Sequence, residues 1–595
     1  NLDFTFSSLT VSSKLSVDYN EGHRDIFYPR SLMDEVNFAS NYYGYNQRLI
    51  FDNSVRFDWR INERHSLLLR GGGILNWDTY KYNYAYGYRG INDFIKLNLI
   101  EADRNNSNFL NPSGFARQLV YKFLDRTRQN LVSFYGKADY SFQNQYFVSL
   151  LLRTDGSSNA QPTNRWFFSP GLSFRWDLKN SVFTEATTLS AFNFRLGAAR
   201  TGRIYAFDNF SQGPQYTSDI TYSGNITVPG YNAFAVLSRP YNFGWVGYGI
   251  PWAYADRLNA GIDLGLWNDR LNIALDGYIR DDQDQLIGIP SYAEYGYSQS
   301  YEHGMNVRNV GLDVTVAASV LKPTDPKKLA WTSAINLSFN QNRLQALPRG
   351  IDQLVIGDRL LKVGERIDRY WLLLNEGIYA ADEDVPQVNG VRRTFNGITL
   401  RAGDPIWHDT NGDEIITDED RVLTGNAIPK IVGGFDNQFQ FENWTLGANF
   451  HFQLGRKLLN QQMASRFDFV NREGGTSIDA VKEITYWEKH GDYDQYPLYN
   501  PWSTVIPYRV EQDLFLEDGA FLKLRSVTLG YDLSDWFGKR VKSAQRLYLY
   551  GSVFNVFTIS SFSGGDPELA GYTGYYSGYG MTIPRTFTLG VKLGL

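Results

Sequence analysis

One stretch of the chain has the residue types and spacing of a cation site. It runs from Asp409 to Asp420 and reads DTNGDEIITDED. Calcium is bound by six to eight oxygens, and a twelve-residue loop supplies them from positions 1, 3, 5, 7, 9 and 12. The corresponding ligands are Asp409, Asn411, Asp413, the Ile415 carbonyl, Thr417 and Asp420. The sequence therefore predicts a structural calcium ion (Ca²⁺) that stiffens a long loop.

Two positions in this stretch depart from the usual calcium loop. Glu414 lies at position 6, where a glycine normally makes the sharp turn, and position 12 is Asp420 rather than a glutamate. The pattern resembles a dockerin loop more than an EF-hand, and we expect a low affinity. The alternative is a turn rich in Asp and Asn that holds no ion. A catalytic metal is not expected, because His408 is the only histidine beside the cluster.

The composition excludes several classes of protein. The 595 residues include no cysteine, which rules out thiol catalysis, Cys-based zinc sites and disulfides. The six histidines are scattered and form no HExxH pair. A net charge of −5 gives no support for nucleic-acid binding, which needs concentrated basic surface. We identify no catalytic residues and expect no enzymatic activity.

The last ten residues alternate strictly between two kinds of side chain. The apolar parity holds Phe587, Leu589, Val591, Leu593 and Leu595, and the polar or small parity holds Thr586, Thr588, Gly590, Lys592 and Gly594. A β-strand sends alternate side chains to opposite faces, so this strand has one apolar face. The ending resembles the assembly signal of outer-membrane β-barrels, although those signals usually end in an aromatic residue.

The same alternation recurs along the chain and predicts an all-β fold, a large transmembrane antiparallel barrel over residues 1–595. Apolar faces recur at 55–61, 146–152, 271–279, 331–339 and 444–454. In a membrane barrel such faces contact lipid while the polar parity faces the lumen, and strands of about ten residues span the membrane. There is no 18-residue apolar run, and aromatics make up 16% of the chain, which suits a membrane–water interface.

A soluble alternative is a set of β-sandwiches, with shorter strands around an apolar interior. One version of it is a carbohydrate-active enzyme, which would need two carboxylates at glycosidase spacing. The outward apolar faces argue against both.

The predicted connections come in two sizes. Short turns at 62–63 and 268–270 contrast with long loops at about 203–255, 345–430 and 456–515. Outer-membrane barrels show this asymmetry, with short periplasmic turns and long outer loops. The last long loop is predicted to carry a short helix, with Ala480, Ile484 and Trp487 on one stripe.

Several motifs, taken in order across 130–595, resemble the SusC/RagA family of TonB-dependent outer-membrane transporters. They are Arg153–Ser158 with Asn164–Trp166 (R-x-D-G-S-S…N-R-W), Phe194–Gly202 (F-R-L…T-G), Asn259–Asp263 and Asn309–Asp313 (N-x-G-x-D), Glu517–Arg525 (E-D-x-x-F-L-K-L-R), Asn555–Phe557, and Gly565–Glu568 (G-D-P-E). Each motif alone is weak, and their order makes the resemblance strong.

The resemblance implies a barrel of the 22-stranded type, of which this stretch holds about sixteen to eighteen strand candidates. It also implies import of oligosaccharides or peptides, energy from TonB, and a SusD-like surface lipoprotein as partner. No plug or Ton box is recognisable, so we expect that the plug and first strands are absent from this stretch. The alternative is a SusC-like structural subunit of a larger outer-membrane complex, such as a barrel-insertion or secretion machine.

The long loops are the expected seat of the lipoprotein, because they are rich in aromatic residues of the types favoured at interfaces. These include Trp245, Tyr248, Trp252, Trp371, Trp487 and Trp502. About half of them are expected to pack within the loops or to form the membrane girdle instead. Four loop tyrosines, Tyr572, Tyr575, Tyr576 and Tyr579, are candidates for stacking against sugars. Substrate-binding residues are otherwise unknown.

Overall fold

The structure is a computed structural model and is built mainly from β-strands. It describes residues 1–33, 37–88, 93, 120–204, 216–218, 230–231, 234–235, 237–240, 245–292, 299–325, 327–388, 390–467, 487, 489, 496–497, 505, 507–534, 536 and 546–594. The chain divides into two compact units. The first comprises residues 1–176, 197–257 and 283–303, and the second comprises 177–196, 258–282 and 304–595.

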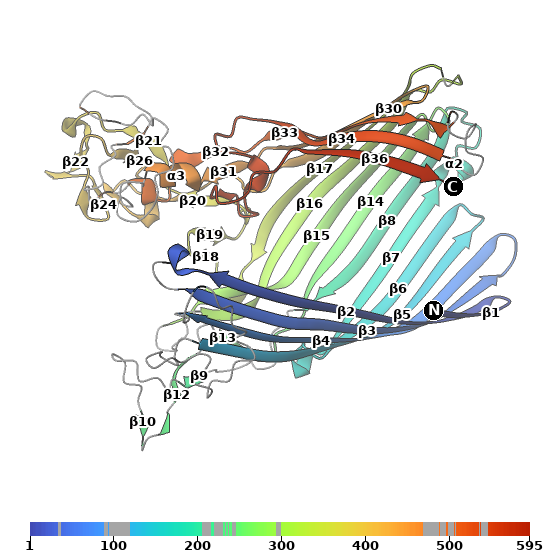
Figure 1. Ribbon diagram of the computed structural model, residues 1–595, viewed down its shortest axis with the longest axis horizontal. Helices are drawn as coiled ribbons and strands as arrows, with labels where there is room; N and C mark the ends of the chain where they lie inside the picture. The colour runs from blue at the N-terminus through green and yellow to red at the C-terminus, as the bar shows by residue number, and fades with distance from the viewer. Residues whose placement is uncertain are drawn as a thin grey trace. The chain divides into compact units, whose positions relative to one another are not determined.

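The first unit contains a meander of antiparallel strands, which includes the paired strands β2, β3 and β4 (Figure 1). Each strand pairs with the next: β1 (Leu2–Phe6), β2 (Leu9–Tyr28), β3 (Phe38–Arg60), β4 (His65–Tyr88), β5 (Val120–Phe142), β6 (Tyr146–Ser157) and β7 (Trp166–Asp177). Short strands follow: β9 (Tyr216–Ser218), β10 (Gly230–Tyr231), β11 (Phe234–Ala235), β12 (Leu237–Pro240) and β13 (Trp245–Val246). The turn after β5 uses Gln143 and Asn144 with positive φ, a conformation that Asn tolerates.

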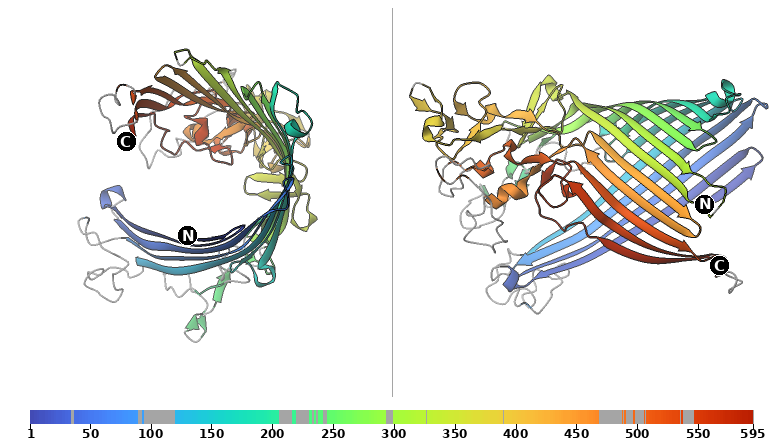
Figure 2. Two further views of the ribbon diagram at one scale, coloured as in Figure 1. Left: turned by 90° about the vertical axis from the view of Figure 1, so that its right-hand side faces the viewer. Right: turned by 90° about the horizontal axis from the view of Figure 1, so that it is seen from above.

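The second unit contains a second antiparallel meander (Figure 2). Its strands are β16 (Gln299–Leu321), β17 (Ala330–Ala346), β29 (Ile431–Phe441), β30 (Trp444–Leu454), β33 (Phe521–Asp532), β34 (Arg546–Ser560) and β36 (Thr586–Gly594). Like β16, the strands β8 (Leu189–Arg203), β14 (Ala253–Leu266) and β15 (Leu271–Pro290) contribute residues to both units. The short helix α2 (Leu178–Ser181) follows β7. The strands expected at 331–339, 444–454 and the C-terminus are confirmed.

Many strands are longer than the ten residues expected. The strands β29 and β30 have 11 residues each, but β2, β3 and β4 have 20, 23 and 24. The expectation was wrong for these long strands because backbone pairing continues past the apolar stretch. In the C-terminal half of β4, tyrosine side chains pack against aromatic rings of the neighbouring strand. Tyr82 stacks with Tyr42, and Tyr86 packs against Phe38.

Each meander carries an apolar face that points away from the protein. In the second unit, Leu589 is 92% exposed, and Leu529 and Leu446 follow it on the same face through directly opposite pairs. In the first unit, the exposed Leu150 and Leu172 lie directly opposite each other. Each such side chain in water would forgo about 1.5–3 kcal/mol of burial free energy. The faces therefore fit hydrocarbon, as the alternation predicts.

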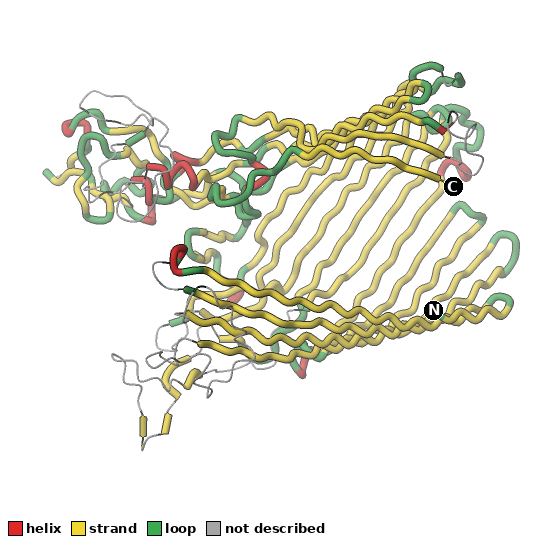
Figure 3. Tube along the Cα trace, viewed as in Figure 1, coloured by secondary structure: helices red, strands yellow, loops and turns green. Residues whose placement is uncertain are grey.

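One end of the second meander carries an ordered body, here named the loop body, which comprises residues 347–388, 390–430, 456–467, 505, 507–520 and 561–580. Figure 3 shows it as short yellow strands and red helical turns joined by green loops. Its strands are β18 (Gln353–Ile356), β19 (Arg359–Lys362), β20 (Tyr370–Leu372), β21 (Asn375–Ile378), β22 (Gln387–Val388), β23 (Val391–Arg392), β24 (Thr394–Phe395), β25 (Ile398–Thr399), β26 (Pro405–Trp407), β27 (Ile415–Ile416), β28 (Val422–Thr424), β31 (Lys457–Asn460), β32 (Leu516–Asp518) and β35 (Tyr575–Tyr576), with helix α3 (Gln461–Phe467).

The loop body has its own hydrophobic core. Tyr370, Leu372 and Phe515 form one buried cluster, and Leu400 and Trp407 belong to another. The long loops predicted at 345–430 and 456–515 are thus largely folded where the structure describes them. Most of the expected helix, including Ala480 and Ile484, lies outside the described residues. Among those that are described, no helix is both long and apolar enough to cross a bilayer.

Candidate functional site

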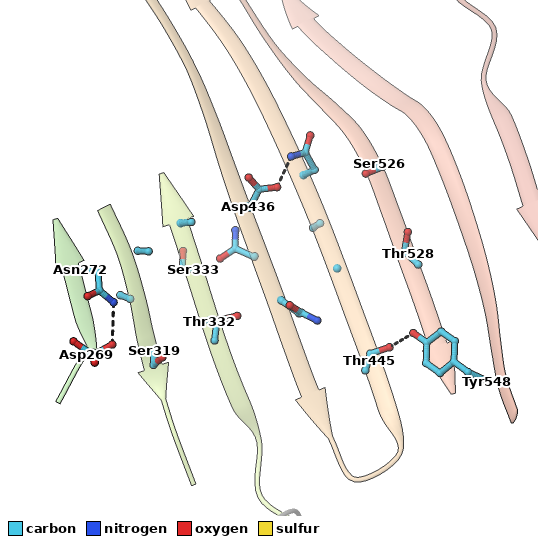
Figure 4. A pocket seen from close by; sticks show the side chains of 18 residues that line it. Asp269, Asn272, Ser319, Thr332, Ser333, Asp436, Thr445, Ser526, Thr528 and Tyr548 are labelled. Atoms are coloured by element: carbon cyan, nitrogen blue, oxygen red, sulfur yellow. Dashed lines mark hydrogen bonds between the residues drawn. The ribbon is translucent and has the colours of Figure 1, made fainter. Parts of the chain in front are cut away.

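The polar face of the second meander holds a shallow depression of about 550 Å³ (Figure 4). Its lining is small or polar: Ala317, Ser319, Thr332, Ala334, Asp436, Gln438, Thr445, Gly447, Asn449, Ser526, Thr528 and Tyr548 all contribute. They share a face because they are opposite neighbours, as in Ala317 with Ala334 and Gly447 with Thr528. Small side chains leave the depression open, and hydroxyls and amides keep it wettable.

Hydrogen bonds between neighbouring strands hold these polar side chains in place. The hydroxyls of Thr445 and Tyr548 are 2.5 Å apart, and those of Thr528 and Ser552 are 2.8 Å apart. Asn449 donates to Asp436 across β29 and β30. The face therefore offers hydroxyl and amide groups in fixed positions to a solute.

The family-like motif at 194–202 supplies the main ionic contact of the same unit. The guanidinium of Arg195 donates to both carboxylate oxygens of Asp263 at 2.8 Å and also contacts Asp276 at 2.8 Å. Asp263 comes from the first N-x-G-x-D motif. The motif pair thus places a cation between two carboxylates on three strands, and the wall carries little uncompensated charge at this point.

The glycines of the two N-x-G-x-D motifs make room for side chains from the neighbouring strand. A Cβ at Gly311 would lie 2.3 Å from the ring of Tyr278, whose hydroxyl donates to Asn340 at 3.3 Å. A Cβ at Gly261 would lie 2.4 Å from the carboxylate of Asp276. These motif positions are structural, because each glycine lets a polar side chain lie flat on the wall.

In the first unit, the R-x-D-G-S-S block is equally structural. Arg153 forms a fork with Asp155 at 2.7–3.0 Å, and Ser133 donates to the same carboxylate at 2.5 Å. Gly156 lies under the ring of Trp166, where a Cβ would meet ring atoms at 2.8 Å. Two motifs separated by a turn therefore lock onto each other.

A third contact joins two distant motifs at the end of β33. Lys523 is only 1% exposed, and its ammonium donates to Asp566 at 2.7 Å and to Glu568 at 2.5 Å. Arg525 contacts the other oxygen of Glu568. The motif comparison did not predict this contact, although the opposite charges of E-D-x-x-F-L-K-L-R and G-D-P-E were a usable signal. Removing one member of such a buried group costs about 3–5 kcal/mol.

The predicted calcium loop lies in the loop body and is closed by backbone hydrogen bonds. Asp409 accepts from the N–H groups of Gly412 at 2.7 Å and Glu414 at 2.8 Å. The buried Asp420 accepts from Thr410 and Thr417, both at 2.9 Å. The segment is thus closed by a series of Asx-type turns.

Two other members of the loop also accept hydrogen bonds from backbone N–H groups. Asn411 accepts from the Asp413 N–H at 3.0 Å, and Asp413 accepts from the Ile415 N–H at 2.8 Å. Ile416 at position 8 is fully buried, as expected. Glu414 has a φ of 61°, the left-handed conformation that glycine adopts without strain.

A cation already lies beside this loop. The Arg393 guanidinium is 2.5 Å from Glu414 and 3.7 Å from Asp409. Burial raises the pKa of Asp409, but the backbone N–H groups and Arg393 outweigh it, and the net pKa is lowered. Within the described ranges, no three His, Cys, Asp or Glu side chains converge closely enough to hold a metal ion. Calcium at this loop stays a prediction.

The four loop tyrosines that were candidates for sugar stacking fall into two groups. Tyr575 contacts Asp358, and Tyr576 packs edge-on against Phe562, so both belong to the interior of the loop body. Tyr572 and Tyr579 are exposed. Of the interface aromatics, Trp252 and Trp487 are buried and Tyr248 is exposed, while Trp502 lies outside the described residues.

Known proteins share both sequence and fold with this chain. No family model matches. TonB-dependent receptor P39 of Formosa agariphila is 25% identical over 603 residues, covering 94% of this chain and 54% of the receptor. TonB-dependent receptor SusC of Bacteroides thetaiotaomicron is 24% identical over 595 residues, covering 96% and 53%. The chain spans about half the length of these relatives.

The fold matches solved structures of the RagAB peptide transporter. One has a TM-score of 0.74 at 17% identity and covers 99% of this chain and 60% of the solved chain. The RagAB peptide importer in the closed-closed state gives 0.75 at 18% identity, with 99% and 61% covered. The relatives are receptors and transporters, which are not enzymes. The chain is therefore SusC/RagA-like, and it is an outer-membrane β-barrel chain related to the TonB-dependent receptors.

Proposed function

We propose that the chain is the barrel portion of an importer that moves oligosaccharides or peptides across the outer membrane with energy from TonB. The observation that carries this proposal is the polar wall of the second unit. It combines a wettable depression with an apolar outer face on the same strands. Such a wall lets a hydrophilic solute pass a membrane protein without meeting lipid.

The lining of the depression suits neutral or zwitterionic polar solutes. Its hydroxyl and amide groups include both donors and acceptors, and of its two carboxylates, Asp269 and Asp436, the second is engaged by Asn449. Both sugars and peptide backbones present donors and acceptors of this kind, so the wall does not choose between these substrates. Among the similar proteins, one solved structure is named as a peptide transporter and one relative is named SusC.

We also propose a SusD-like surface lipoprotein as partner, seated on the loop body. The loop body is ordered, with a core that includes the fully buried Trp407, and can therefore present a fixed surface. That surface exposes apolar side chains, namely Val355, Val388, Val391, Ile415, Tyr572 and Tyr579. Exposed apolar groups that gather on a rigid body commonly mark an interface.

The second function considered, a structural subunit of a barrel-insertion or secretion machine, is not favoured. The relatives are named as receptors and a transporter. Transport and assembly roles also differ in their consequences for the cell. Loss of an importer removes uptake of its substrate, whereas loss of an assembly subunit lowers the amounts of other outer-membrane proteins.

The proposed import function can be tested by narrowing the depression in the wall. Ala334 lines the depression, whereas its neighbour Ile335 lies on the apolar face. We expect Ala334→Trp to reduce uptake of labelled oligosaccharide or peptide mixtures in cells that express the full-length protein, because the ring fills the depression. Ile335→Trp is the matched control and should leave uptake near normal. Equal uptake by both variants, or uptake that persists without TonB, would contradict the proposal.

The lipoprotein is tested separately by purification of the tagged protein in mild detergent. A surface lipoprotein in comparable amount is expected to co-purify, and a permanent interface should bury more than about 2,000 Å². Recovery of the barrel alone would rule the partner out, whatever the outcome of the uptake assay.

A further inference from the structure

A second pocket of the second unit, of about 700 Å³, combines apolar and basic walls. Val310, Leu312 and Phe339 form its apolar side. Its basic side is formed by four residues, Arg343, Arg366, Arg369 and Lys430. Neither the transport function nor the lipoprotein partner accounts for this combination.

The pocket lies on the lipid-facing side of the wall. Leu312 lies directly opposite Phe339, which in turn lies opposite Ile431, and opposite residues of paired strands share a face. Ile431 lies opposite Leu454, which is exposed like Leu312. Arg343 follows Phe339 by four residues on the same parity of β17, and is exposed too.

The length of β17 places the basic residues at the edge of the membrane. Trp331 stacks on Phe439 at the short-turn end of the strand, in the position of an interfacial aromatic girdle. At about 3.3 Å per residue and a tilt of about 40°, Phe339 lies roughly 20 Å above Trp331 and Arg343 roughly 30 Å above it. The apolar band of such barrels is about 25 Å tall and therefore ends between Phe339 and Arg343.

The pocket carries positive charge that the protein does not neutralise. Arg366 forms a fork with Asp368 at 2.9 and 3.0 Å, and Arg369 pairs with Glu365 at 2.7 Å. The Nε of Arg343 donates to the carbonyl of Gly364 at 2.7 Å. Within the part of the chain that the structure describes, no carboxylate pairs with Arg343 or with the exposed Lys430. Two cations of the pocket lining are therefore left without a carboxylate partner, and one of them, Arg343, lies on the outward face.

We propose that this pocket binds the phosphate group of an anionic lipid of the outer leaflet. Guanidinium and ammonium groups are the usual phosphate partners, and the acyl chains would lie along Val310, Leu312 and Phe339. The leaflet follows from the strand ends. The loop body marks the outer side and the two-residue turn after β29 marks the periplasmic side. Arg343 lies at the loop-body end. The proposal requires the outer-membrane location but not transport.

The test uses purified full-length protein in dodecyl maltoside and bisphosphorylated lipid A as the probe, with bound lipid measured by native mass spectrometry. The pocket variant is R343Q/K430Q. The matched control is K327Q/K328Q, which removes the same charge from exposed lysines in the turn between β16 and β17, at the opposite end of the strands. Each interfacial cation contributes about 1 kcal/mol, so the pocket variant is expected to bind roughly thirtyfold more weakly.

Three further arms make the result decisive. Dephosphorylated lipid A should bind the wild type and R343Q/K430Q equally. Inorganic phosphate alone should not displace lipid A, because it lacks the acyl chains, and full displacement would reassign the pocket to free phosphate and overturn the lipid proposal. If the double variant fails to fold, K430Q alone should bind about fivefold more weakly while Arg343→Lys retains binding. Equal binding of lipid A by the pocket and control variants would refute the proposal.

Discussion

The wall of the second meander and the loop body place the same residue types on opposite sides. In the wall, Leu589 and Leu529 point outward while Thr445 and Asn449 face the polar interior. In the loop body, the apolar Trp407 and Leu400 are fully buried. The two regions show that the solvent decides which side an apolar residue occupies. In the wall, which faces lipid, apolar side chains lie outside, whereas in the loop body, which faces water, they lie inside.

Polar contacts differ between the two regions as well. In the wall, polar side chains hydrogen-bond to one another across neighbouring strands, as Thr528 does with Ser552 at 2.8 Å. The loop body uses side chains to satisfy its irregular backbone. Gln512, for example, accepts from the Trp407 indole at 2.9 Å and donates to the Pro507 carbonyl at 2.6 Å. Strand pairing satisfies the backbone groups of the wall, so its side chains are not needed for that purpose. In the loop body, side chains hydrogen-bond to backbone groups that have no strand partner.

The largest expected effect is a substitution that breaks the water-type core. Trp407→Ala should destabilise the loop body by about 3–5 kcal/mol, because it leaves a cavity and removes one hydrogen bond of the buried Gln512. Amide hydrogen exchange of the loop body should rise while that of β33 and β34 stays slow. The matched control is Trp444→Ala on the exposed apolar face, which should cost much less. An equal loss of stability in the two variants would contradict the proposed difference between the two regions.

A charge on the lipid-facing side tests the inverted wall. Leu589→Arg should cost about 2–4 kcal/mol if the residue lies at the bilayer midplane, and less near an interface. The same charge on the polar face, as Thr588→Arg, should be tolerated. Unfolding by urea in lipid vesicles gives the two values. Full tolerance of charge at both Leu589 and Val591 would contradict the lipid-facing assignment.

A pH dependence is expected in the loop body. Burial raises the pKa of Asp404 to about 6 from its ordinary value of 3.8, against the N–H of Arg401, which lowers it. Because the folded-state pKa is raised, stability is highest below pH 4 and falls by about 1–3 kcal/mol as the pH rises through about 6. Asp404→Asn should remove this slope. Thermal unfolding followed between pH 4 and pH 7 would show it, and an unchanged slope would disprove the assignment.

The smallest expected effect concerns calcium. Ion binding at residues 409–420 with the weak affinity of extracellular sites should stabilise the loop body by about 1 kcal/mol at millimolar calcium. Calcium titration followed by terbium luminescence should saturate in the wild type and fail in Asp413→Asn. Asp418→Asn is the control, because position 10 supplies no ligand. A high-resolution map with Asp409 and Asp413 splayed apart and no density between them would refute the site.

Much of the wall was predictable from the sequence. The alternation at 331–339 and at 586–594 assigns each side chain to a face, and the structure confirms the assignment through Leu589 and Leu529. The lengths of β2, β3 and β4 were not predictable in this way. Pairing past the membrane depends on the neighbouring strand, and a local pattern does not report it.

The candidate site was likewise predictable from the sequence only in part. The residues of the calcium loop follow from spacing alone, and the burial of Ile416 confirms one detail of that pattern. The cation Arg393, which lies beside Asp409 and Glu414, was missed because it precedes the loop by many residues. The basic pocket was missed for the same reason, since Arg343 and Lys430 are separated by most of the loop body.

The sequence by itself determined which side chains face lipid and which face the polar wall, because that choice depends on a two-residue period within one strand. It also carried the motifs that identify the family resemblance. Only the tertiary structure decided what those motifs do. Arg195 meets Asp263 and Asp276 because strand register aligns residues that lie 68 and 81 positions apart. Lys523 meets Asp566 and Glu568, 43 and 45 positions away, because the helical turn after β34 lies against β33. Register is a property of paired strands, and no single strand encodes it.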